Sequence, residues 1–150
     1  MARIRVWSLA AAVLVCGAIG LAQQERGAWR AVSNTARSIT GDVALTDERI
    51  SINYTSFTMA RQRTLTTAEL SALFETEGGS GNLFRLDIPA AKRFVKKNTL
   101  CGSSDVQWLA TYVEGKELRL AFFSGGKAPV LTAEGLANST DLCGIYTYAR

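Results

Sequence analysis

"VQWLATYVEGKELRLAFF", residues 106–123, is the stretch that decides the fold. Two apolar runs, 106–113 and 117–123, flank Glu114-Gly115-Lys116, and this pattern is typical of antiparallel strands joined by a tight turn. The stretch therefore predicts a β-hairpin, the most clearly marked one in the chain.

Further strands are predicted on both sides of this hairpin, because larger apolar residues alternate there with small or polar ones. These additional strands cover residues 41–45, 50–54, 84–88 and 142–148. Phe57 and Met59 resume the alternation with the opposite parity, which indicates a bulge or bend near Thr55-Ser56. The chain thus has six or seven predicted strands.

Two short helices are predicted between the strands. Thr66 and Glu69 fit a capping box ahead of apolar residues at helical spacing. The second helix starts at Pro89, ends at Asn98 and has an apolar stripe opposite a basic side. Residues 125–140 predict a long surface loop with a helical turn near its middle. The predicted class is α+β, with a mainly antiparallel sheet that can curl into a small barrel.

Residues 1–22 predict a secretory signal peptide. Arg3 and Arg5 precede the uncharged residues 6–22, and Gly20-Leu21-Ala22 supplies the small residues of a cleavage site after Ala22. The uncharged run has 17 residues, whereas a membrane-spanning helix needs about 20. A membrane anchor is therefore the weaker alternative.

The three cysteines indicate an oxidising compartment. Cys16 follows Val15, and not the Gly, Ala or Ser expected before the lipid-modified cysteine of a bacterial lipoprotein, so we expect Cys16 to leave with the signal peptide. The remaining pair, Cys101 and Cys143, predicts one disulfide in a periplasmic or secreted protein.

The exported chain is expected to be a single α+β domain at residues 41–150, with residues 23–40 as a polar segment leading into it. Without Arg3 and Arg5 the net charge falls from +4 to +2, from 15 Lys and Arg against 13 Asp and Glu. A field this weak does not favour nucleic acid as a partner.

The chain contains no histidine. It therefore lacks the usual general base near neutral pH, the usual partner of a catalytic serine or cysteine, and the commonest zinc ligand. The glycine-rich residues 78–81 are not followed by Lys-Ser/Thr, so they predict a flexible connection and not a phosphate-binding loop. We expect no enzymatic activity, no cofactor and no bound metal.

A cluster of cations on the second predicted helix is the main candidate binding surface, since no acid nearby in the sequence balances it. These cations are Lys92, Arg93, Lys96 and Lys97. They suit an anionic lipid, an acidic glycan or a carboxylate-lined enzyme cleft, and a solvated helix face is the alternative. Lys127, at the end of the loop 124–127, is an accessory candidate. Aromatic residues of the strands are expected in the core, and an exposed one would be a natural binding anchor.

Gly27-Ala28-Trp29 resembles the Gly-x-Trp element at the start of lipocalin-like barrels and of the small bacterial periplasmic protease inhibitors built on that barrel. The chain is also similar in size, export and disulfide use to small exported β-rich lysozyme inhibitors. Two departures stand against the resemblance: the chain is short for a full eight-stranded lipocalin, and two predicted helices interrupt the strands.

The leading functional hypothesis is a non-enzymatic exported binding module of the bacterial envelope, with an inhibitor of a hydrolase as its most concrete form. The alternatives are a lipocalin-like carrier of a small apolar ligand and, third, a histidine-free hydrolase. The expected partner is a protein or an anionic envelope component, with no nucleic acid and no stable membrane span after signal cleavage.

Overall fold

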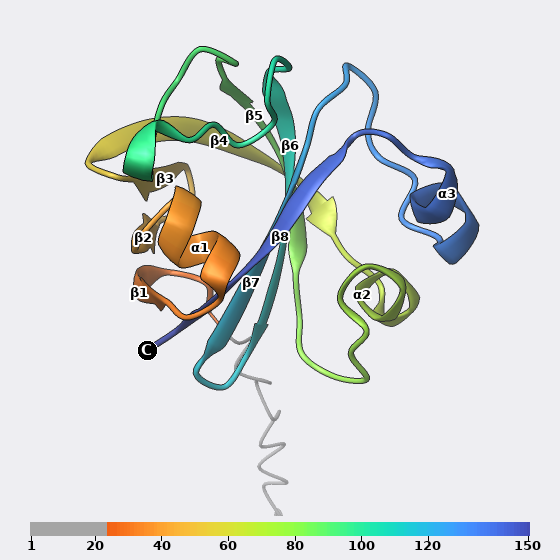
Figure 1. The fold of residues 1–150 in the computed structure, drawn as a ribbon. Helices are drawn as coiled ribbons and strands as arrows, with labels where there is room; N and C mark the ends of the chain where they lie inside the picture. Colours follow the sequence, from red (N-terminus) through yellow and green to blue (C-terminus); the bar gives the residue numbers. More distant parts are fainter. Residues whose placement is uncertain (1–23) are drawn as a thin grey trace, which may run out of the picture.

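Eight antiparallel strands close into a barrel in the structure, a computed structural model that describes residues 24–150 (Figure 1). Each strand pairs with its neighbours in chain order, and β8 pairs with β1. The strands are β1 (Gly27–Ala31), β2 (Val43–Leu45), β3 (Arg49–Ile52), β4 (Thr55–Thr64), β5 (Asn82–Ile88), β6 (Val106–Glu114), β7 (Glu117–Phe123) and β8 (Leu142–Ala149). The predicted α+β class with a curled antiparallel barrel is confirmed. The predicted signal peptide, its cleavage site and Cys16 lie outside the described residues.

The hairpin predicted over residues 106–123 is the pairing of β6 with β7. The register ends at Glu114 opposite Glu117, so Gly115 and Lys116 form a two-residue turn. Gly115 has a φ of 57°, which glycine adopts without the steric cost of a side chain. The turn chemistry read from the sequence therefore sets the register of the β6–β7 pairing.

Alternation along the strands divides the apolar residues between two cores. Side chains from all eight strands fill the barrel interior, and the large ones that are completely buried include Trp29, Ile50, Ile52, Phe122, Tyr146 and Tyr148. A second core lies on the outer face of β5, β6 and β7, under the helices α2 (Thr67–Phe74) and α3 (Ala133–Asn138). Because β6 and β7 have apolar residues on both faces, their sequences are almost continuously apolar.

The predicted capping box at the start of α2 is confirmed. The Thr66 hydroxyl accepts a hydrogen bond from the Glu69 amide, and the Glu69 carboxylate accepts one from the Thr66 amide. Arg63 donates to both carboxylate oxygens of Glu69. These bonds favour the charged carboxylate and lower the pKa of Glu69 to about 2.

The second predicted helix is wrong: residues 89–98 form no α-helix. Their only helical element is the 3-10 turn η1 (Val95–Lys97), inside which Lys96 has a φ of 54°, and Lys97 has a φ of 60°. The apolar stripe of the predicted helix consists of Ala91, Phe94 and Val95. In the structure Phe94 packs into the interior core. A helix of this length has little stability of its own, so burial of one aromatic side chain decides the conformation.

The change of parity at Phe57 arises from a hairpin turn and not from a bulge near Thr55-Ser56. Asn53 and Tyr54 turn the chain from β3 into β4, with Ile52 paired to Thr55. A two-residue turn reverses the strand and brings both apolar sets to the same face of the sheet.

The barrel begins ahead of the boundary expected at residue 41. The polar segment before that residue contributes β1 and the helix α1 (Asn34–Ile39), which contacts β8. With α3 close to the helical turn expected in the loop 125–140, the described chain has three short α-helices and not two. None of the helices within residues 24–150 is long and apolar enough to cross a membrane.

The predicted disulfide is confirmed. Cys101, in the connection between β5 and β6, is bonded to Cys143 in β8, and their Cα atoms are 5.0 Å apart. The bridge fixes this connection, which carries the candidate cations, to the wall of the barrel.

Candidate functional site

The connections of the barrel gather at its two ends. One end, here called the loop end, carries α1, the β3–β4 turn, the β5–β6 connection and the β7–β8 connection. The opposite end carries the start of β1, the connection that contains α2, and the β6–β7 turn (Figure 1). This division follows from the antiparallel order, because successive connections alternate between the ends of a closed barrel.

The predicted cations share one segment at the loop end, residues 92–97 of the β5–β6 connection, here called the basic turn. Arg93, Lys96 and Lys97 are exposed, and Lys92 is half-buried. In Figure 1 this connection, drawn in green, passes beside the ends of β3 and β4. The cations therefore project from an irregular turn and not from one side of a helix.

The side chains of the basic turn have no partner of opposite charge in the described part of the chain. Ion pairs within residues 24–150 join Arg26 to Asp47, Arg63 to Glu69 and Arg119 to Glu117. Unpaired like charges on one short segment produce a positive potential that favours an anionic partner.

Phe94 holds the basic turn on the barrel. Its side chain is 5% exposed, and its ring meets the ring of Phe57 in β4 edge to face, with centroids 6.1 Å apart. The Phe94 amide donates to the Asn98 carbonyl at 2.8 Å, and the Asn98 side-chain amide donates to the Ser38 carbonyl in α1 at 2.8 Å. The turn is thus fixed to both β4 and α1.

Two further contacts fix the base of the β5–β6 connection. The Asp105 carboxylate accepts a hydrogen bond from the Ala90 amide at 2.7 Å, which joins the two ends of the connection. The Cys101–Cys143 disulfide attaches its second half to β8. These contacts hold the backbone from which Lys96 and Lys97 project, both with positive φ angles.

Lys127, the accessory candidate, lies at the same end of the barrel but in the β7–β8 connection. It is exposed, and within residues 24–150 no hydrogen bond or ion pair joins it to the basic turn. Ser124 and Lys127 also have the Ser-x-x-Lys spacing of some catalytic pairs, which our sequence analysis missed. The Ser124 hydroxyl is directed to Asp141, with its carbonyl and carboxylate oxygens both at 3.4 Å.

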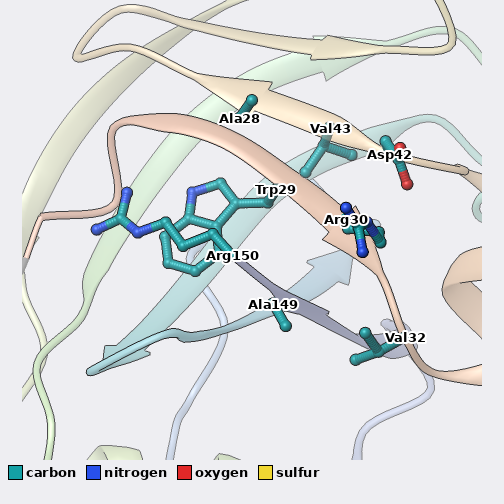
Figure 2. Close-up of a pocket in the computed structure, with 8 residues that line it drawn as sticks. All are labelled: Ala28, Trp29, Arg30, Val32, Asp42, Val43, Ala149 and Arg150. Carbon is teal, nitrogen blue, oxygen red and sulfur yellow. The ribbon is translucent and has the colours of Figure 1, made fainter.

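A surface pocket of about 470 Å³ lies where β1 changes its pairing from β2 to β8 (Figure 2). The Arg150 guanidinium stacks on the Trp29 ring, 4.1 Å from the ring centroid, and donates to the Arg26 carbonyl at 2.7 Å. The Asp42 carboxylate accepts a hydrogen bond from the Ala31 amide. Arg150 thus joins the end of β8 to β1, and Asp42 joins β1 to the segment ahead of β2.

The opposite end contains a half-buried acid that sequence analysis missed. One carboxylate oxygen of Glu25 accepts hydrogen bonds from the Thr111 hydroxyl and the Asn82 side-chain amide, both at 2.6 Å. Burial raises the pKa of Glu25, although these two hydrogen bonds and the charge of Arg61 oppose the rise. No pattern in the polar segment distinguishes Glu25, because its partners lie far away in the sequence.

The described residues hold no group of three His, Cys, Asp or Glu side chains that is arranged to bind a metal ion. In comparisons with known proteins, no family model, no curated protein and no solved structure matches this chain. The assignment of a function therefore depends on the geometry of the loop end.

Proposed function

We propose that this protein is an exported, non-enzymatic binding protein of the bacterial envelope, and that its basic turn docks onto an acidic surface of a partner protein. The observation that carries the proposal is the set of unpaired cations on a turn fixed by Phe94, Asn98 and the disulfide. A carboxylate-lined cleft, such as that of a hydrolase, offers the complementary charge, so inhibition of such an enzyme is the most specific form of the proposal.

The distribution of charge at the loop end favours a protein over an anionic lipid surface. Two acidic side chains of the same end lie at the base of the β5–β6 connection and at the end of the β7–β8 connection, namely Asp105 and Asp141. A flat anionic bilayer that touches the whole end would meet these acids as well as the cations, whereas a local acidic patch on a protein meets the basic turn alone.

A carrier of a small apolar ligand is the second candidate, and one observation favours it. The Tyr146 hydroxyl is buried in the interior of the closed barrel without a hydrogen-bond partner, and such groups are rare unless a water or a ligand satisfies them. The packed aromatic side chains of the interior support the binding protein instead. Native mass spectrometry of protein purified from its own cells tests the carrier, which requires a bound small molecule of constant mass.

The experiment that tests the proposal is quantitative capture of envelope proteins on immobilised full-length mature protein. The double variant Lys96→Glu/Lys97→Glu should weaken capture of the main partner about tenfold, since charge reversal replaces attraction with repulsion. Capture by the unaltered protein should also fall as salt rises from 50 to about 300 mM.

The matched control is Arg49→Glu/Lys116→Glu, which changes the net charge by the same amount. Arg49 and Lys116 are exposed and lie at the opposite end of the barrel. The control variant should capture the partner as the unaltered protein does. If the two double variants lose capture equally, or if neither loses it, the basic turn is only a solvated surface and the proposal fails.

A further inference from the structure

Tyr54, at the tip of the β3–β4 hairpin, is fully exposed, with 104% relative accessibility. Every other Trp and Tyr among residues 24–150 is buried. A ring in this position contributes nothing to either apolar core, although an aromatic side chain is among the most effective at burying surface. Its presence at the tip therefore needs an explanation other than packing within the domain.

The backbone at this tip disfavours a tyrosine. Asn53 has a φ of 47° and Tyr54 has a φ of 66°, the pattern of a two-residue hairpin turn in which both central residues are left-handed. Asn-Gly is the preferred pair for such a turn, and a bulky side chain in the second position is strained. The chain thus keeps asparagine at the first position and accepts strain to place an aromatic ring at the second.

Tyr54 and the basic turn belong to the same end of the barrel. Both are at the loop end, and Phe57, the third residue after Tyr54, packs on Phe94 at the centre of the basic turn. The hairpin is stiffened by a hydrogen bond of 2.7 Å between the Ser51 and Ser56 hydroxyls. Ring and cations are therefore presented together on connected, well-fixed backbone.

We propose that Tyr54 is the aromatic anchor of the interface, and that it enters an apolar pocket of the partner protein whose rim carries the carboxylates bound by the basic turn. This inference rests on the proposed function and adds the chemistry of the partner's site. A tyrosine suits this role because its rigid ring buries a large area with few rotatable bonds and its hydroxyl remains able to bond at the rim.

The decisive variant is Tyr54→Gly, because it separates function from stability. Glycine relieves the left-handed strain, so the midpoint of thermal unfolding should rise by about 3 °C. Affinity for the captured partner should fall about 30-fold, the loss typical of an interface hot spot. The control is Val130→Ala, which truncates the other strongly exposed apolar side chain at the loop end and should leave affinity unchanged.

The outcomes separate the two proposals. If Tyr54→Gly binds as tightly as the unaltered protein while Lys96→Glu/Lys97→Glu does not, the anchor is wrong and the basic turn stands. If Tyr54→Gly, Lys96→Glu/Lys97→Glu and the control Val130→Ala all bind as the unaltered protein does, both proposals are wrong. Loss of affinity in Tyr54→Gly with retention in Val130→Ala supports the anchor.

A photo-cross-linker shows what Tyr54 touches. With benzoylphenylalanine at position 54, the cross-linked peptide of the partner should contain an apolar residue with Asp or Glu close by, as identified by mass spectrometry. Cross-linking to phosphatidylglycerol-containing vesicles in place of the partner, or to a partner peptide without carboxylates, would overturn the inference.

Discussion

Removal of the disulfide, through Cys101→Ser/Cys143→Ser, should lower the free energy of unfolding by about 4 kcal/mol. The two cysteines are separated by 42 residues, and for a loop of that length the chain-entropy relation gives about 4 kcal/mol at 25 °C. A single domain is stable by only about 5–15 kcal/mol, so the bridge supplies a large share. The midpoint of thermal unfolding should fall by about 15 °C.

Urea denaturation followed by tryptophan fluorescence measures this loss, since Trp29 and Trp108 are both buried and change environment on unfolding. The unaltered protein in reducing buffer should match the double variant, which controls for the substituted side chains. Hydrogen exchange should also accelerate in residues 92–105 of the variant, because the connection loses its attachment to β8.

A loss below about 1 kcal/mol, with an unchanged dependence on urea, would refute this reasoning. It would mean that the unfolded chain gains little freedom when the bridge is absent. A changed slope of the free energy of unfolding against urea concentration would instead show that the bridge alters how compact the unfolded chain is.

Two further variants test the two ends of the barrel. Glu25→Gln should raise the free energy of unfolding at pH 7, because Thr111 and Asn82 can still donate to the amide oxygen while no charge is buried. Because the pKa of Glu25 is raised in the fold, the unaltered protein is relatively most stable at low pH, where Glu25 is neutral, and it loses this stability as pH rises through the raised pKa. The free energies of unfolding of the two proteins, measured with urea, should therefore converge near pH 4. A difference that stays constant with pH would show that the charge of Glu25 is not its cause. At the loop end, Phe94→Ala should lower the free energy of unfolding in urea by about 3 kcal/mol. The variant should also weaken partner capture, although it changes no charge. Unchanged capture would show that the shape of the basic turn is irrelevant to binding.

The parts of the fold that were predictable are those where local chemistry and tertiary packing agree. Residues 106–123 have turn residues at the required positions between apolar runs, and Thr66 with Glu69 has a complete capping box. Each of these signals lies within a few residues of the element that it predicts, so no distant contact is needed to interpret it.

The errors occur where a distant contact decides the conformation. Ala91, Phe94 and Val95 have helical spacing, but Phe94 is taken up by the barrel core beside Phe57. The β3–β4 turn was missed because Tyr54 occupies the position where glycine would have marked a hairpin. Its mismatch with the turn is also the reason that we propose Tyr54 as a binding residue.

For the candidate site, the sequence identified the cations but neither their arrangement nor their neighbours. Four basic residues in six positions are visible without a structure, whereas the bond from Asn98 to Ser38 and the position of Tyr54 at the same end of the barrel depend on the closed barrel. The pairing of Cys101 with Cys143 followed from counting the cysteines that remain after signal cleavage.

The closure of the barrel has a consequence for the order of folding. β1 pairs with β8 through only Arg30 opposite Ala149 and Ala31 opposite Tyr148, and Arg150 completes the seam by stacking on Trp29. These contacts join the first strand to the last, so they carry the largest loop-closure entropy in the molecule and cannot form before the final residues are free. If the protein is exported amino terminus first, as we propose, the barrel stays open until residues 147–150 have crossed the membrane, so the chain remains unfolded at this seam throughout translocation.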